Sequence, residues 1–252
     1  MPRRARRDCD GNYFHLMVQG IGRCNIFPSD DFKGYYLSAI ARYKQKFDVK
    51  LLAFCVMGNH AHALVKAGDT EVLSLFMRHV NTEYAKYYNR MKNRVGYVFR
   101  DRYKSETIKN SKHLVYCLAY IQNNPVKAGL VAAAADYPFS SYTNYLNNTG
   151  IVDFSEAANH YDTSPSNITA IMQERPALTW LEHDDKQYEN AAAVLTEIIK
   201  RHKLDGKTTL LADDELLKES ATEIHVRSGL SFRKISALLN INREKLRRLM
   251  RV

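Results

Sequence analysis

The chain has 252 residues, of which 45% are hydrophobic, and its 37 basic against 27 acidic residues give a formal charge of +10. This composition excludes wholesale disorder and favours a polyanionic partner such as nucleic acid, although a basic but unspecialised surface would look the same. The four cysteines form no CxxC pair, and no apolar run approaches the roughly 20 residues of a membrane helix. We therefore expect a reduced, cytoplasmic protein without a zinc ribbon or membrane segment.

The first half of the chain alternates between strand and helix patterns. Short aromatic and β-branched runs are typical of strands, and apolar residues spaced by three and four are typical of helices. In chain order we predict strand 13–19, helix 29–47, strand 49–57, turn 58–59, strand 60–66, helix 70–92, extended segments within 98–108, and a helix from Ser111. The last helix should end near Asn124 because Pro125 follows. This β-α-β-β-α-β order predicts an α+β fold: a ferredoxin-like antiparallel sheet with helices on one face.

Loop signals dominate from residue 132 to about residue 176, and helical periodicity then returns. We therefore expect three parts: residues 1–148 as one domain, 149–184 as a linker, and 185–252 as a helical C-terminal domain.

The last 25 residues have the pattern of a helix-turn-helix. Ser231 and Asn242 can each cap a short helix, and the apolar residues of the two helices would form one core. The second helix carries several cations, including Arg243 and Arg247, which could face duplex DNA. A small helical bundle with a solvated basic face would produce the same pattern.

Two histidines open the second strand of the predicted hairpin. Residues two apart on a strand point to the same face, so His60 and His62 can approach one ion. Such a pair is common without any metal, and alone it is weak evidence.

The helix that begins at Ser111 places Tyr120 and Asn124 on one face. A phenol with a pKa of about 10 is a poor nucleophile, and a nearby divalent cation helps mainly by polarising the phosphate under attack. Asn124 offers an amide oxygen. Two imidazoles and one amide oxygen suit Mg²⁺ or Mn²⁺ when the substrate phosphate supplies negative charge. Without further knowledge, Tyr120 is more simply one of 16 tyrosines that fill a groove.

Four blocks within the first 145 or so residues share the pattern of a known family. They are 13–19 (YFHLMVQ), 57–62 (MGNHAH), 99–105 (FRDRYKS) and 120–130 (YIQNNPVKAGL). Together they resemble the REP-associated tyrosine transposases, within the HUH superfamily of single-strand endonucleases. The resemblance implies that His60 and His62 bind the metal and that Tyr120 is the nucleophile. It also implies that Asn124 completes the metal site, while Gln122 stands where relatives often have histidine.

The same resemblance implies a reaction and a partner. Tyr120 would attack a phosphate in single-stranded DNA at REP-like hairpins, giving a 5′-phosphotyrosine enzyme and a free 3′-hydroxyl that can rejoin strands. The protein would work as a monomer or a homodimer. Two alternatives remain: a DNA-binding regulator with an unused or inactive nuclease site, and a metal hydrolase of small phosphoesters.

Several cations and one aromatic residue are candidate DNA contacts, because cations neutralise phosphates and rings stack on unpaired bases. An ordinary strand with a solvated basic face is the alternative for the central block. We expect His15 and His113 to be structural or substrate-facing. The candidate contacts are Arg3, Arg4, Arg100, Arg102, Tyr103, Lys104 and Lys127, together with the C-terminal cations Arg243 and Arg247.

Overall fold

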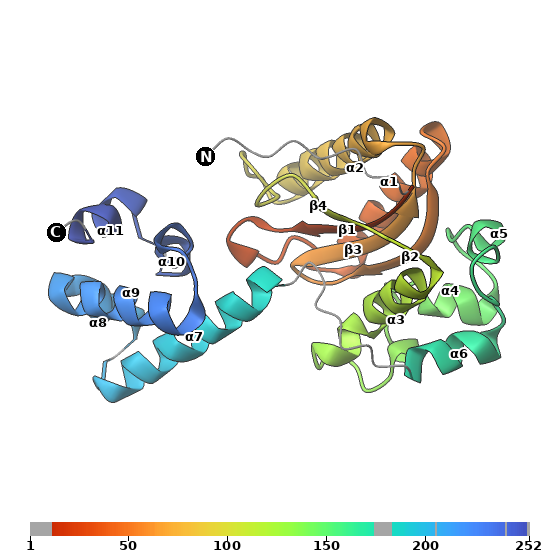
Figure 1. Ribbon diagram of the computed structural model, residues 1–252. Helices are drawn as coiled ribbons and strands as arrows, with labels where there is room; N and C mark the ends of the chain where they lie inside the picture. The colour runs from red at the N-terminus through yellow and green to blue at the C-terminus, as the bar shows by residue number, and fades with distance from the viewer. Residues whose placement is uncertain (1–11, 174–182, 205, 240, 251–252) are drawn as a thin grey trace. The chain divides into compact units, whose positions relative to one another are not determined.

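The computed structural model describes residues 12–173, 183–204, 206–239 and 241–250 (Figure 1). The chain divides into two compact units, Met1–Ala177 and Leu178–Val252, and each is described by itself. In these described ranges no helix is both long and apolar enough to cross a membrane. The candidate contacts Arg3 and Arg4 lie outside the described residues.

The first unit is built on a four-stranded sheet in the order β2-β3-β1-β4. Each pair of neighbouring strands is antiparallel. The predicted ferredoxin-like sheet is therefore confirmed, and two strand ranges agree with the prediction at both ends. The strands are β1 (Tyr13–Gln19), β2 (Lys50–Val56), β3 (His60–Lys66) and β4 (Lys104–Thr107).

Two helices cover one face of this sheet, as the β-α-β-β-α-β order predicted. They are α1 (Asp30–Lys46) and α2 (Thr70–Met91), which lie side by side above the sheet in Figure 1. Their apolar side chains meet those of the central strands β1 and β3. The contact set includes Leu16, Val18, Tyr36, Ile40, Ala61, Ala63, Phe76 and Met77.

A third helix, α3 (Ser111–Lys127), covers the opposite face of the sheet. The prediction that it ends before Pro125 was wrong, because the helix continues through Pro125 for two more residues. Near the end of a helix a proline removes only one internal hydrogen bond. The helix instead ends just before Gly129, which adopts a left-handed backbone conformation with a φ of 67°. The amide of Gly129 bonds to Val126 O and that of Leu130 to Pro125 O, as in a Schellman motif.

The segment that follows α3 contains the 3-10 turn η2 (Ala134–Asp136) and the helices α4 (Tyr142–Asn147), α5 (Phe154–Ala157) and α6 (Pro165–Gln173). The turn η2 and helix α4 lie in the predicted first domain, whereas α5 and α6 lie within residues 149–184, which the sequence predicted as a linker. A second 3-10 turn, η1 (Ile21–Arg23), follows β1. Residues 149–173 differ from the prediction because few but well-spaced apolar side chains, such as Ala157 and Ile168, are fully buried.

The second unit is a small helical bundle with its own core. Its helices are α7 (His183–Arg201), α8 (Lys207–Ala212), α9 (Asp214–Ser228), α10 (Phe232–Leu239) and α11 (Arg243–Leu249). Asn242 caps α11 by accepting from the amide of Glu244 at 2.8 Å, as predicted. Ile235 and Leu246 are buried in the core, with Leu238 packed against it. The helix α8 was not predicted.

Candidate active site

Three histidines meet on the sheet face that α3 covers. The Nε2 atom of His15 lies 3.0 Å from the Nδ1 atom of His62, and both side chains are buried. The ring centroids of His60 and His62 are 5.0 Å apart. This meeting follows from the register, because β1 and β3 are neighbours and Met17 pairs with His62. His15, two residues before Met17, therefore shares the face of the histidine pair.

Tyr120 reaches this cluster from α3. Its ring centroid lies 5.7 Å from that of His15 and 5.8 Å from that of His62, and both contacts are edge-to-face. Strands β1 and β3 and helix α3 thus each contribute a side chain to one buried cluster. The arrangement places a phenol beside imidazoles at the surface where α3 meets the sheet.

Asn124 lies one helical turn beyond Tyr120 and is 3% exposed. Its Nδ2 atom donates to the backbone oxygen of Tyr120 at 3.1 Å. Because the amide nitrogen is used inside the helix, the side-chain oxygen Oδ1 is the end that could serve as a ligand.

Burial keeps two of the histidines neutral. It lowers the pKa of His15 to about 3, with a smaller contribution from the charge of His113. Burial also lowers the pKa of His62 well below its ordinary value, with further contributions from His60, His15 and two lysines. Neutral imidazole is the form that binds a metal ion.

The two lysines that act on His62 are Lys127 and Lys104. Lys127 follows the tyrosine on α3, with its Nζ atom 5.4 Å from the Tyr120 ring centroid. Lys104 lies on β4, where it pairs with Met17 and so shares the face of His62. Both cations, which the sequence proposed as DNA contacts, therefore flank the cluster where a phosphate would carry negative charge.

The described part of the chain contains no group of three or more His, Cys, Asp or Glu residues arranged for a metal ion. A cation at this cluster would therefore need the amide oxygen of Asn124, or oxygens from substrate and water, beside His60 and His62.

The comparisons with known proteins agree with this geometry. Residues 9–124 match the model of the family described as "Transposase IS200 like", a stretch that contains all three histidines and ends at Asn124. This stretch of the chain is therefore similar to the IS200-like transposases.

Two similar proteins are informative. A curated protein of Haemophilus influenzae, whose name assigns it provisionally to the REP-associated tyrosine transposases, is 26% identical over 122 residues. That match covers 44% of this chain and 69% of the relative. A solved structure of a REP-associated tyrosine transposase bound to a REP hairpin has a TM-score of 0.51 at 18% identity. It covers 72% of this chain and 96% of its own, and shows that the two share a fold.

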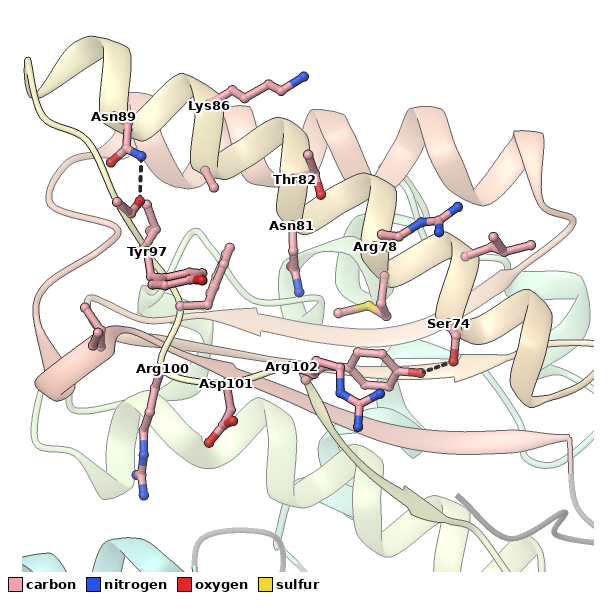
Figure 2. Close-up of a pocket in the computed structure, with 18 residues that line it drawn as sticks. Ser74, Arg78, Asn81, Thr82, Lys86, Asn89, Tyr97, Arg100, Asp101 and Arg102 are labelled. Atoms are coloured by element: carbon pink, nitrogen blue, oxygen red, sulfur yellow. Dashed lines mark hydrogen bonds between the residues drawn. The ribbon is translucent and has the colours of Figure 1, made fainter. Parts of the chain in front are cut away.

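Other residues proposed from the sequence lie between α2 and β4 in the first unit. Arg100 donates through its backbone amide to Gln19 O at 2.8 Å and through Nη1 to Gln19 Oε1 at 3.0 Å. Arg102 is exposed. Tyr103 is only 7% exposed, and its hydroxyl lies 3.1 Å from Ser74 Oγ, which leaves little of its ring for a base (Figure 2).

The C-terminal candidates Arg243 and Arg247 are exposed on α11, in the second unit. Arg247 lies 3.4 Å from Glu244 in an exposed ion pair, a kind of contact that a phosphate can replace. Their neighbour Lys245 pairs with Asp214 at 2.8 Å and so helps hold α11 against α9.

The sequence reasoning did not identify the contacts of His15 on β1. It assigned this residue to a structural or substrate-facing role, whereas the structure places it against both His62 and Tyr120. The ferredoxin-like strand order puts the first strand beside the third. Combined with the two-residue alternation of β1, that order could have identified the contact.

Gln122, on the same helix, makes different contacts from those of Tyr120. It is fully buried, and its Nε2 atom donates to Ser141 Oγ at 3.2 Å. Ser141 in turn accepts from the amide of Phe54 on β2. Gln122 therefore joins α3 to the edge of the sheet.

Proposed function

We propose that this protein is a transposase: a metal-dependent single-strand DNA endonuclease and strand-transferase that acts through a 5′-phosphotyrosine intermediate. The observation that carries the proposal is the position of Tyr120, whose ring packs edge-on against His15 and His62. Buried imidazoles and two lysines around a tyrosine are typical of a functional site and not of a tyrosine that only packs in a core.

His60, His62 and Asn124 are the proposed ligands of Mg²⁺ or Mn²⁺. The donor set fits such an ion because the low pKa of His62 keeps that imidazole neutral and available. The set carries no charge of its own, so the phosphate of the DNA completes it. When bound, the ion would act as a Lewis acid on that phosphate and as a template for its orientation.

Tyr120 and two lysines have separate roles in the proposed cleavage. The Oη atom of Tyr120 forms a bond to phosphorus as the bond from phosphorus to the 3′ oxygen breaks. The phenol loses a proton and the departing 3′ oxygen gains one, so no proton is consumed overall. Lys104 and Lys127 offset the negative charge of the phosphate. The reverse attack by a 3′-hydroxyl rejoins DNA and releases Tyr120.

The proposed substrate is single-stranded or hairpin DNA of REP type. The supporting observations are the likeness in fold to a transposase solved with a REP hairpin and the basic side chains near the site. Arg3, Arg4, Arg100 and Arg102 are proposed to hold the backbone of that DNA. Helices α10 and α11 are proposed to add affinity for duplex DNA through Arg243 and Arg247.

The test is covalent capture of the cleaved strand. Hairpin oligonucleotides labelled at either end are incubated with the protein and Mg²⁺ or Mn²⁺, and the products are separated under denaturing conditions. We expect an adduct that keeps only the 3′ label, because the protein stays on the 5′ phosphate of the downstream fragment. Tyr120→Phe should lose the adduct while still binding the hairpin. Binding without any adduct across a panel of REP-like hairpins would favour the DNA-binding regulator instead.

A further inference from the structure

A groove of about 900 Å³ lies between α2 and the segment of residues 96–103 (Figure 2). Two hydrogen bonds fix the two walls to each other. Near one end Tyr103 and Ser74 join their hydroxyls at 3.1 Å, and at the other Asn89 Nδ2 donates to Gly96 O at 2.8 Å. Because both ends are fixed to α2, the groove between them is already formed before any ligand arrives.

The groove carries positive charge that the described part of the protein does not neutralise. Arg78 and Lys86 line it from α2, and Arg102 lines it from the opposite wall. None of these three side chains forms an ion pair with another described residue. Some cations elsewhere on the same unit are paired, as in Arg42–Glu83 at 2.8 Å and Lys44–Asp153 at 2.7 Å.

Among the described residues, the lining contains one carboxylate, that of Asp101, which Figure 2 shows pointing away from α2, to the same side as Arg100 and Arg102. The lining residues that come from α2 are therefore either basic or uncharged, with Asn81 and Thr82 between Arg78 and Lys86. A surface of this kind selects an extended anion.

An exposed aromatic ring identifies the kind of anion. Tyr97 lines the groove with 83% of its surface exposed, and the exposed apolar side chains of Ile21 and Leu75 also line it. A cationic groove with an aromatic platform is the combination that binds single-stranded nucleic acid, since cations follow the backbone and a ring stacks on a base. Bases in a duplex are already stacked on each other and do not offer their faces.

The groove is connected to the histidine cluster through one residue. Gln19 accepts both hydrogen bonds from Arg100, a lining residue, and it pairs with His60 in the register of β1 and β3. The amide of Ile21 donates to Val98 O at 3.0 Å, which holds the groove wall along the end of β1. A DNA strand at His60 therefore lies next to the groove.

We propose that this groove binds the unpaired DNA strand that continues from the cleaved phosphate, with Arg78, Lys86 and Arg102 on its phosphates and Tyr97 stacked on one base. The proposal rests on the function proposed above and adds a second contact region to it, in which α2 takes part.

The test compares two matched charge reversals in the full-length protein. Arg78→Glu/Lys86→Glu changes the groove, and Arg90→Glu/Lys92→Glu makes the same charge change at the C-terminal end of α2, outside it. Binding of a labelled single strand of about 12 nucleotides is measured over a range of salt concentrations. We expect the groove variant to bind roughly tenfold more weakly and its salt slope to be shallower by about 1.4, since each lost phosphate contact removes about 0.7. The control should match the wild type.

A cross-linking experiment tests the stacked base. Hairpins with 5-iodouracil placed in the unpaired flank are irradiated with the protein, and the modified peptide is identified by mass spectrometry. We expect cross-links to Tyr97 that persist in Tyr97→Phe and disappear in Tyr97→Ala.

The proposal is overturned if the groove variant binds the single strand as tightly as the wild type. It is also overturned if affinity for a fully paired duplex falls by the same factor, because the groove would then not select unpaired DNA. Both outcomes are independent of the covalent adduct formed by the wild-type protein, so failure of the proposed reaction and failure of the groove can be told apart.

Discussion

The Nε2 atom of His15 and the Nδ1 atom of His62 are 3.0 Å apart in a buried contact between neighbouring strands. A histidine that is held through Nδ1 can bind a cation only through Nε2. His15 therefore fixes the orientation of the His62 ring, as hydrogen-bond partners of metal-binding histidines commonly do.

The first prediction concerns this contact. His15→Ala should weaken Mn²⁺ binding by roughly 10- to 100-fold, because the His62 ring loses its orienting partner. His15→Gln should recover much of the affinity, since its amide can still bond to Nδ1. Mn²⁺ affinity is measured by electron paramagnetic resonance without DNA. Equal affinities in wild type and His15→Ala, with the fold intact, would show that His15 does not position His62.

A second prediction concerns Glu156, a half-buried carboxylate on α5 that bonds to Tyr13 on β1 and Lys66 on β3. Burial alone would raise the pKa of Glu156, but hydrogen bonds from Tyr13 and Lys66 outweigh it, so that its pKa is lowered on folding. A lowered pKa gives stability that is present above the unfolded pKa of about 4.3 and is lost as the pH falls through the folded value. At pH 7, Glu156→Gln should cost about 1–3 kcal/mol.

Denaturant unfolding of wild type and Glu156→Gln at several pH values checks this. The difference between the two proteins should be constant from pH 6 to pH 8, and it should shrink below roughly pH 4. A difference that stays the same at acid pH would contradict the assignment of the effect to the carboxylate charge.

The third prediction addresses Gln122, which differs from the histidine often found in relatives. Gln122→Leu loses the bond to Ser141 but also removes a buried Oε1 atom that has no hydrogen-bond partner among the described residues. The net change in unfolding free energy should be about 1 kcal/mol or less. Cleavage should continue at the wild-type rate because Gln122 contacts the sheet edge. A tenfold loss of cleavage in a fully folded variant would place Gln122 in the reaction.

The fourth prediction concerns the second unit. Deletion of the residues after Asp213 removes the whole of α9, α10 and α11, along with Arg243 and Arg247. Duplex affinity should fall several-fold more than the rate of single-strand cleavage, since the site lies in the first unit. Gel-shift assays on blunt duplex and adduct assays on hairpins measure the two quantities. Unchanged duplex affinity in the shortened protein would rule out DNA reading by α11.

The sequence was sufficient for the parts of the fold that repeat a simple period. The boundaries of β1 and β3 were predicted to the residue, because β1 is a short aromatic and β-branched run that stops at Gly20 and a Gly-Asn turn precedes β3. The face shared by Tyr120 and Asn124 also follows from helical spacing alone. The roles of those residues came from the family resemblance, since a histidine pair or a tyrosine is uninformative by itself.

Other features depend on contacts that no local pattern contains. The end of α3 is set by Gly129 and its Schellman bonds, although Pro125 is the stronger stop signal in the sequence. The segment 149–173 folds because scattered residues such as Ile168 find partners on α3 and α4. The groove depends on two hydrogen bonds between residues far apart in the chain, Ser74 with Tyr103 and Asn89 with Gly96.

The position of Gln19 has a mechanical consequence. One face of its strand carries the histidines and Tyr120, while α2 and the groove lie towards the other face. A DNA strand that occupies both places has to turn sharply around the end of β1 within a few nucleotides. Duplex DNA, with a persistence length of about 150 base pairs, resists such a turn, whereas an unpaired strand bends readily. The end of β1 would therefore exclude duplex DNA because the duplex is stiff, without any contact to a base.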